Sequence, residues 1–209
     1  MMRVLHIIAR MNIGGTATYL RNLIDGLETK GVNNLLAVGH VPSNEREDSR
    51  LSELNFKRID SLSRSLNLVL DIRASSELKS IIGEFKPDIV HSHTFKAGLL
   101  ARSRNSEVPN VHTFHGHHLY DPEFGWFSGS VLNWIERRLA RRSERLLTIG
   151  EKVGKELLAQ GIGSADQYLS IPPGIESLED VNAASVRKKL GIGKTDFVVV
   201  WLGRFTQVK

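Results

Sequence analysis

Residues 4–27 read VLHIIARMNIGGTATYLRNLIDGL, and the fold of the whole chain depends on the pattern in this stretch. Its first five residues form an almost entirely apolar run, which is typical of a buried strand. A glycine pair at 14–15 follows, and the apolar residues beyond it recur at helical spacing: Tyr19, Leu20, Leu23, Ile24 and Leu27. Gly31 stands where a glycine commonly ends a helix. The sequence therefore predicts a strand over 4–8, a glycine loop and a helix over 16–29.

The same alternation of short apolar runs and amphipathic stretches continues along the chain. Periodicity predicts further strands and helices; the strands are 35–38, 56–59, 88–91, 110–114, 146–149 and 168–171, and the helices 66–85, 95–104, 131–142 and 151–160. Pro87 is expected to end the second helix, because proline disfavours helical geometry in the residue before it. Parallel neighbouring strands need crossover helices, so this order predicts an α/β fold with a doubly wound, Rossmann-like parallel sheet.

The final stretch, residues 197–209, reads FVVVWLGRFTQVK and has a different character. Its apolar run predicts a buried strand over 197–202, which would need cover on both faces, and a basic loop that contains Gly203 follows. We therefore expect residues 1–180 to form one complete Rossmann-like domain. Residues 181–209 are expected to form a linker helix and the first strand of a second, truncated domain.

Composition narrows the possible classes of protein. The chain has 209 residues, a formal net charge of +5 and no cysteine, so a disulfide scaffold and thiolate metal sites are excluded. No apolar run reaches the roughly 18 to 20 residues that span a bilayer, and the residues after the first strand are too polar for an export signal. We expect a cytoplasmic protein. Five arginines fall within residues 137–145, but no nucleic-acid-binding pattern accompanies them, so nucleic acid is not an expected partner.

The loop Gly14-Gly15-Thr16 lies between the first strand and the first helix. Backbone amides at a helix N-terminus can face an anion, and glycine permits its close approach. The spacing does not match a dinucleotide fingerprint, and a pair of glycines that only makes a turn explains the loop equally well. A second glycine motif, Gly193-Lys194-Thr195, lacks the upstream glycine of a P-loop and precedes a strand, so a P-loop is excluded.

Histidines provide a second signal, since five of the eight lie at the ends of two predicted strands: His91, His93, His115, His117 and His118. Alternation along a strand places His91 and His93 on one face. Imidazoles are good zinc ligands, and Asp121 and Glu123 could add carboxylates, so a metal site is one interpretation. Histidines that only satisfy loop backbone groups are another.

Two cations follow the last predicted strand. Arg204 could contact a diphosphate in a bidentate manner, and Lys209 could act on it as a point charge. The alternative is that Lys209 is simply solvated.

Taken in order, these motifs resemble the glycosyltransferases of the GT-B fold, specifically the large retaining family 4. The resemblance rests on five segments: RVLHI to GGT at 3–16, KPDIVHSH at 86–93, VHTFHGH at 111–117, IPPGIE at 171–176 and GRF to lysine at 203–209. Pro173 departs from the asparagine that is usual in the fourth segment, which changes turn chemistry. The second domain of the family, which holds most of the donor, is not covered, so the fragment alone is expected to be inactive.

The resemblance implies a role for each loop. Gly15, flanked by Gly14 and Thr16, would contact the donor diphosphate, and Arg204 and Lys209 would stabilise the charge that grows on it. His115 would contact the transferred sugar. A second group would shape the acceptor pocket: His93, His117 and His118. The donor would be a UDP- or GDP-linked sugar, and no metal would be required.

The resemblance also implies a process. The loop over 116–127 resembles that of bacterial members that build surface polysaccharide on lipid carriers, so the expected acceptor is a glycan or a lipid-linked glycan. A sugar-nucleotide epimerase of the same fold and a non-catalytic glycan-binding module are the alternatives.

Contact with a membrane is a further possibility that the sequence leaves open. The arginine-rich helix at 134–145 could lie on anionic lipid at the inner face of the plasma membrane. Alternatively this helix is solvated, and its arginines alternate with residues that face the core: Trp134, Ile135, Leu139 and, just after the helix, Leu146.

Overall fold

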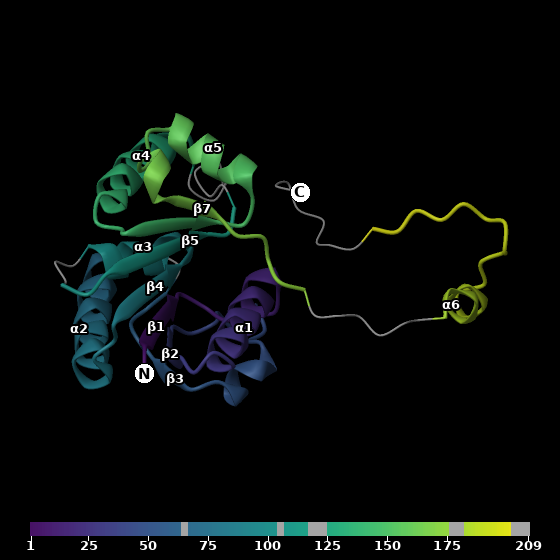
Figure 1. The fold of residues 1–209 in the computed structure, drawn as a ribbon, viewed down its shortest axis with the longest axis horizontal. Helices are drawn as coiled ribbons and strands as arrows, with labels where there is room; N and C mark the ends of the chain where they lie inside the picture. The colour runs from purple at the N-terminus through teal and green to yellow at the C-terminus, as the bar shows by residue number, and fades with distance from the viewer. Residues whose placement is uncertain (64–66, 104–106, 117–124, 176–181, 202–209) are drawn as a thin grey trace. The chain divides into compact units, whose positions relative to one another are not determined.

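The structure is a computed structural model, and it describes residues 1–63, 67–103, 107–116, 125–175 and 182–201. The chain divides into two compact units, Met1–Gly174 and Ile175–Lys209. The first unit holds a seven-stranded sheet (Figure 1). In the second unit the described residues include one helix, α6 (Ala183–Lys189).

All seven strands of the sheet are parallel, and their order is β3-β2-β1-β4-β5-β6-β7. In chain order the strands are β1 (Arg3–Ile8), β2 (Asn33–Val38), β3 (Phe56–Arg58), β4 (Ile89–His93), β5 (Asn110–Phe114), β6 (Arg145–Thr148) and β7 (Tyr168–Ser170). The prediction of a doubly wound α/β fold is confirmed, and each predicted strand of the first unit is present.

Helices cover both faces of this sheet. They are α1 (Gly15–Glu28), α2 (Leu68–Phe85), α3 (Thr94–Arg102), α4 (Gly125–Ala140) and α5 (Glu151–Ala159), with short 3-10 turns at Ser49–Glu53 and Ala165–Gln167. Figure 1 shows α1 and α2 on opposite sides of β1 and β2. Helix α3 packs on the same side as α2, so α1 alone among these three covers the other face.

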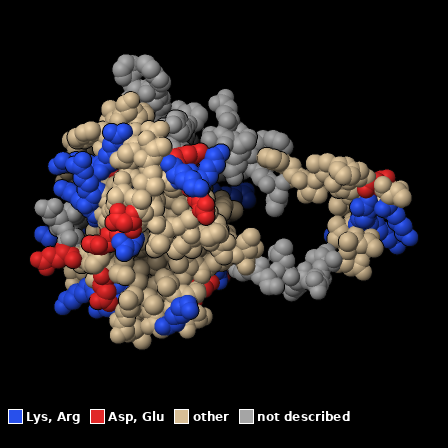
Figure 2. All heavy atoms as spheres, turned by 45° about the horizontal axis from the view of Figure 1, so that its top comes forward, with Lys and Arg blue, Asp and Glu red and all other residues tan. Residues whose placement is uncertain are grey.

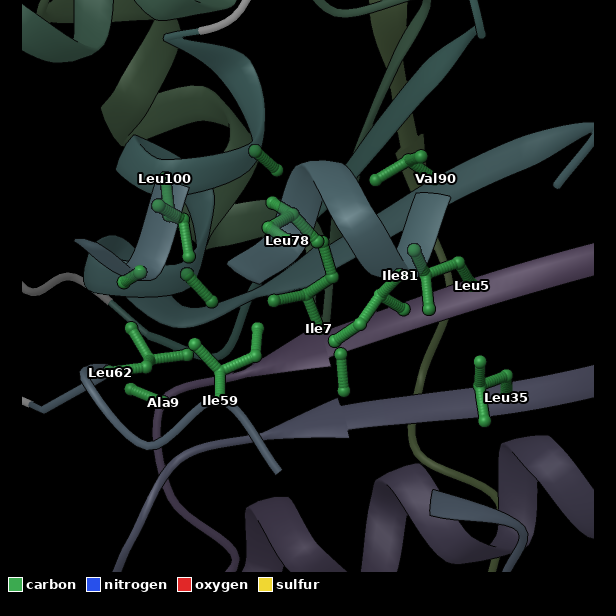
Figure 3. Packing of buried hydrophobic residues seen from close by; sticks show 14 residues of the cluster. Leu5, Ile7, Ala9, Leu35, Ile59, Leu62, Leu78, Ile81, Val90 and Leu100 are labelled. Atoms are coloured by element: carbon green, nitrogen blue, oxygen red, sulfur yellow. The ribbon is translucent and has the colours of Figure 1, made fainter. Parts of the chain in front are cut away.

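Alternation along the strands divides the core between the two faces. Leu5 and Ile7 of β1 lie beside Leu78 and Ile81 of α2 (Figure 3). The residues of opposite parity pack with α1 instead, in a cluster that contains Ile8, Leu20, Ile24, Leu36 and Val38. Each fully buried Leu or Ile contributes about 1.5–3 kcal/mol relative to an exposed one, so both faces of β1 are strongly specified. This explains why β1 reads as an almost continuous apolar run.

Glycines end two helices, and one of them, Gly31, is the glycine that the sequence predicts. Gly31 adopts a φ of 75° after α1, and its amide donates to the carbonyl of Glu28 at 2.9 Å. Gly161 adopts a φ of 72° after α5, and its amide donates to the carbonyl of Leu158 at 2.8 Å. A side chain at either position would be strained, because left-handed backbone favours glycine.

Two predictions about secondary structure are wrong. Helix α4 begins at Gly125 rather than at residue 131. Each glycine in a helix costs only about 1 kcal/mol, and favourable packing of the helix can exceed that cost. The strand predicted over 197–202 is not formed by residues 197–201. Residues 197–201 would need a neighbouring strand as their hydrogen-bonding partner, and the described residues of Ile175–Lys209 include no strand.

In the view of Figure 2, Lys and Arg side chains lie beside Asp and Glu side chains over part of the molecule. Among the described residues no helix is both long enough and apolar enough to cross a bilayer.

Candidate functional site

The sheet has a topological switch point between β1 and β4. Strands β2 and β3 extend it on one side of β1, and β4 to β7 extend it on the other. The loops that leave β1 and β4 therefore diverge at the carboxyl edge of the sheet, where ligands bind in doubly wound folds. Of the predicted site residues that the structure describes, Gly14, Gly15 and Thr16 follow β1, His93 ends β4 and His115 follows β5, so all of these belong to this edge.

Three buried histidines lie side by side on β1 and β4. The strand register places His6 beside His91 and Ile8 beside His93, so the three side chains share the face that α1 covers. The ring centroids of His91 and His93 are 4.1 Å apart, which confirms that these two residues share a face. His115 follows β5, and its ring centroid lies 5.5 Å from that of His93.

Hydrogen bonds connect these rings into a chain. Nε2 of His6 lies 3.2 Å from the side-chain oxygen of Asn34, and its Nδ1 lies 3.4 Å from Nε2 of His93. Nδ1 of His93 lies 3.2 Å from Nε2 of His115. His91 contacts His6 and His93 through its ring, whereas its Nε2 lies 2.7 Å from the hydroxyl of Thr113. These histidines therefore bond to side chains of the sheet, and the interpretation that they only satisfy loop backbone is wrong for His91 and His93.

Burial keeps the four histidines of this site uncharged at neutral pH. It lowers the pKa of His6 from 6.5 to about 4, and it lowers the pKa of His115 to about 4 as well. The pKa values of His91 and His93 lie well below 6.5, because burial and then the neighbouring histidines disfavour the imidazolium. A neutral imidazole has one donor and one acceptor nitrogen, so each ring can pass a hydrogen bond along the chain.

Helix α1 closes over these rings with an aromatic side chain. The ring of Tyr19 meets the ring of His115 edge-on at a centroid distance of 4.8 Å, and that of His93 at 6.2 Å. Burial raises the pKa of Tyr19, and a hydrogen bond to Thr113 partly offsets this shift. The contact links the helix that starts at the glycine loop to the histidine at the edge of the sheet.

The glycine loop presents an open helix N-terminus. Gly15 and Thr16 begin α1, and Gly14, the residue before the helix, provides no side-chain cap. A Cβ placed on Gly14 or Gly15 would meet nothing within 4 Å, so both glycines face open space rather than close packing. Amides at such a terminus can bind an anion. Packing within the chain therefore does not explain this pair of glycines.

The backbone is strained immediately after β4. Thr94 has a φ of 68°, a left-handed conformation that β-branched residues rarely adopt. Such a residue costs about 1–3 kcal/mol and persists only where the surrounding structure imposes it. Thr94 directly follows His93, so the strain lies at the histidine cluster.

The metal interpretation of the histidines takes a different form in the structure. His6, His91 and His93 each offer a ring nitrogen, and these nitrogens lie within 4.8 Å of one another. The sequence hypothesis already included His91 and His93 but not His6, and the carboxylates that it could add, Asp121 and Glu123, lie outside the described residues.

Other predicted site residues also lie outside the part of the chain that the structure describes: His117, His118, Arg204 and Lys209. Of the predicted residues it does describe, His93 and His115 are brought into hydrogen-bonding contact. Gly14, Gly15 and Thr16 lie at the start of the helix whose Tyr19 contacts both rings.

Sequence reasoning missed three members of this site: His6, Tyr19 and Asn34. The sequence predicts His6 as part of the first strand and gives it no role, although a histidine inside an otherwise apolar buried strand is itself a signal. Tyr19 was assigned to the apolar face of the first helix. Asn34 lies just before the predicted second strand, and only the pairing of β2 with β1 brings it to His6.

The family model described as Glycosyltransferase Family 4 matches residues 13–177. A curated relative, the UDP-Gal:α-D-GlcNAc-diphosphoundecaprenol α-1,3-galactosyltransferase of Escherichia coli, is 28% identical over 154 residues, which are 70% of this chain and 39% of that protein. This chain thus spans less than half of the length of that relative.

Solved structures show the same fold. The sucrose-phosphate synthase of Thermosynechococcus elongatus matches with a TM-score of 0.72 at 15% identity, over 99% of this chain and 57% of that chain. The UDP-GlcNAc 2-epimerase of Neisseria meningitidis matches with a TM-score of 0.55 at 20% identity, over 81% and 45%. The parallel sheet is that of the N-terminal domain of GT-B enzymes, and with the family model matching well over half of its residues, the chain belongs to glycosyltransferase family 4.

Proposed function

We propose that the whole protein transfers a sugar, with retention of anomeric configuration, from a nucleotide-sugar to a glycan or lipid-linked acceptor in surface polysaccharide synthesis. The observation that carries this proposal is the neutral, partly buried His115 at the carboxyl edge of the sheet. It is joined through Tyr19 to the open N-terminus of α1. Membership of family 4 and the lipid-linked substrate in the name of the Escherichia coli relative support the proposal.

Each element of the site has a part in this reaction. The amides of Gly15 and Thr16 face the diphosphate of a UDP- or GDP-linked sugar, and His115 contacts the sugar itself. The bond between the anomeric carbon and the diphosphate oxygen breaks, with its electron pair leaving on the diphosphate. The acceptor hydroxyl oxygen forms the new bond to the anomeric carbon, and its proton passes to the departing diphosphate oxygen. Arg204 and Lys209 stabilise the departing charge, which is the main electrostatic demand of the step.

The domain assignment is part of the same proposal. Residues 1–180 form the acceptor-side domain, and 181–209 form a linker helix and the start of the donor-binding domain. His93, His117 and His118 shape the acceptor pocket. The reaction needs no metal, because basic residues stabilise the leaving group.

His115→Ala in the full-length protein tests the proposal. We expect kcat to fall at least about tenfold, since one lost transition-state hydrogen bond costs about 1.4 kcal/mol or more, whereas KM for the donor should change less. The assay follows transfer of radiolabelled sugar from UDP- and GDP-sugars to a polyprenyl-diphosphate-linked sugar. His40→Ala is the matched control, because the side chain of His40 is mostly exposed and pairs with Asp60. Equal turnover in the His115 variant and the wild type would remove His115 from the mechanism.

An epimerase is the second candidate, since UDP-GlcNAc 2-epimerases share the fold. Incubation of the full-length protein with a nucleotide-sugar and no acceptor separates the two activities. Conversion of the sugar to its epimer would overturn the transferase proposal. Binding of a glycan with neither reaction would favour a non-catalytic module.

We also propose that α4 lies against anionic lipid at the inner face of the plasma membrane, where the acceptor would be anchored. The core-facing assignment of Trp134 is wrong: its side chain is 64% exposed, and Val131 on the same face is 57% exposed. The buried stripe of α4 instead contains Leu132, Glu136, Leu139 and Ala140, roughly opposite Trp134. Exposed apolar residues beside exposed arginines are typical of interfacial helices.

Liposome retention tests this contact. We expect vesicles that contain anionic lipid to retain the protein at low salt and to release it at high salt. Salt screens the attraction between the arginines of α4 and the lipid headgroups. Trp134→Ala should weaken retention, whereas Trp201→Ala, in the other unit, should not. Failure of the wild-type protein to bind at low salt would end the membrane proposal.

A further inference from the structure

The side chains of Asn34, His6, His93 and His115 form a hydrogen-bonded series, which we call the histidine chain. Asn34 sets the direction in which its hydrogen bonds run. Its side-chain nitrogen donates to the carbonyl of Val32 at 3.2 Å, so its side-chain oxygen is the atom that faces His6. An amide oxygen can only accept a hydrogen bond. Nε2 of His6, 3.2 Å away, must therefore carry the proton.

The same reasoning assigns the protonated nitrogen of His93 and then that of His115. Because His6 is neutral and protonated at Nε2, its Nδ1 is an acceptor, and the proton in the 3.4 Å contact belongs to Nε2 of His93. His93 then has an unprotonated Nδ1, which accepts from Nε2 of His115 at 3.2 Å. The one proton of neutral His115 thus lies on Nε2, inside the chain. Its Nδ1 is left as a lone pair, and no described residue bonds to it.

We propose that Asn34, His6 and His93 are positioning residues that hold His115 in the Nε2-protonated tautomer, so that His115 presents Nδ1 as a hydrogen-bond acceptor to a substrate hydroxyl. The identity of that hydroxyl as part of a sugar rests on the proposed function. The tautomer itself follows from the geometry of the ligand-free protein.

Burial makes the direction costly to reverse. His6 and His93 have no exposed surface, and Asn34 is 3% exposed, so bulk water does not stand in for a lost partner. If His6 carried its proton on Nδ1 instead, the oxygen of Asn34 would face an unprotonated nitrogen and two acceptors would meet. An unsatisfied buried polar group costs about 1–3 kcal/mol, which corresponds to a preference for the observed direction of roughly fivefold to more than a hundredfold.

The test is NMR of the protein labelled with ¹⁵N at histidine. Long-range proton–nitrogen correlations show which ring nitrogen carries the proton in each residue. Imidazole in water already favours Nε2, so the decisive result is the effect of Asn34→Leu, which keeps the branching of the side chain and lies three hydrogen bonds away from the reporter. We expect the ratio of tautomers at His115 to fall at least threefold. Asn55→Leu is the matched control, because Asn55 donates to the backbone carbonyl of Asn34 and is not in the chain, and it should leave the ratio unchanged.

A second variant keeps the test decisive if Asn34→Leu does not fold. His6→Phe removes the acceptor of His93, so it should produce the same loss of preference at His115. Protonation of His115 at Nδ1 in the wild type would overturn the proposal. An equal effect of Asn34→Leu and Asn55→Leu would overturn it too.

A metal ion between the rings is the competing explanation. If an equimolar amount of Zn²⁺ shifts the ring-nitrogen resonances of His6, His91 and His93 together, these nitrogens are ligands and the proton chain is wrong. We expect no such shift. None of these measurements requires turnover, so loss of the transferase proposal alone would leave the tautomer result intact.

Discussion

Replacing Glu136 with glutamine should destabilise the first unit strongly, because Glu136 is the partner of a fully buried arginine. Arg102 of α3 and Glu136 of α4 are both 0% exposed. Nη2 of Arg102 lies 3.0 Å from one carboxylate oxygen of Glu136 and 2.9 Å from the other, and its Nε donates to the carbonyl of Gly98 at 3.1 Å. Burial lowers the pKa of the Arg102 guanidinium, and the Glu136 carboxylate opposes that shift.

The expected loss of stability follows from the buried charge of Arg102, which Glu136→Gln leaves without its countercharge. A guanidinium whose countercharge is removed inside a core costs about 3–5 kcal/mol. Domains of this kind have a total free energy of unfolding of about 5–15 kcal/mol, so the loss is a large share of it. With an urea dependence of about 2 kcal/mol per molar, the unfolding midpoint should fall by about 2 M.

Equilibrium unfolding in urea, followed by circular dichroism, measures this loss. Glu151→Gln is the matched control, since Glu151 pairs with Lys155 at 3.5 Å on the surface and both side chains are nearly four-fifths exposed. We expect the control to change the free energy of unfolding by less than about 0.5 kcal/mol. The double variant Arg102→Met with Glu136→Leu removes both charges and should recover most of the loss.

Two outcomes would refute this reasoning. A loss below about 1 kcal/mol for Glu136→Gln would mean that the charge of Arg102 is satisfied by other groups or by water. A double variant no more stable than Glu136→Gln would mean that packing, rather than the buried charge, explains the effect.

Two further predictions concern the glycines of the helices and acid sensitivity. Gly98→Ala should cost about 1–3 kcal/mol, because its Cβ would lie 2.5 Å from both Arg102 and His112, whereas Gly83→Ala, with nothing within 4 Å, should stabilise by about 0.5–1 kcal/mol. Thermal unfolding of both variants checks this, and the same sign for the two changes would contradict it. Burial lowers the pKa of His6 from 6.5 to about 4, so the unfolded state binds more protons between these values and stability falls as pH falls. His6 alone should remove about 2 kcal/mol at pH 5 relative to pH 7.5; urea unfolding at both pH values measures it, and His6→Gln should reduce the difference.

Periodicity was sufficient for the architecture of the first unit. Strands and helices alternated in the predicted order, and Gly31 and Gly161 ended the helices before them. These features depend on local chemistry: apolar runs need burial on both faces, and left-handed backbone favours glycine. The start of α4 and the exposure of Trp134 were not predictable in this way, because which residues of a helix are buried depends on its partner.

The candidate site likewise has features that the sequence predicts and features that only the tertiary structure shows. The sequence by itself determined the parallel sheet, the glycine loop after β1 and the position of His93 and His115 at strand ends, because spacing along the chain fixes where strands stop and which side chains alternate. Only the tertiary structure decided that Asn34 and His6 extend these histidines into a hydrogen-bonded chain and that Tyr19 closes over it. The reason is physical: the register of β1 against β2 and β4 joins residues far apart in sequence, and burial in that register makes the rings neutral.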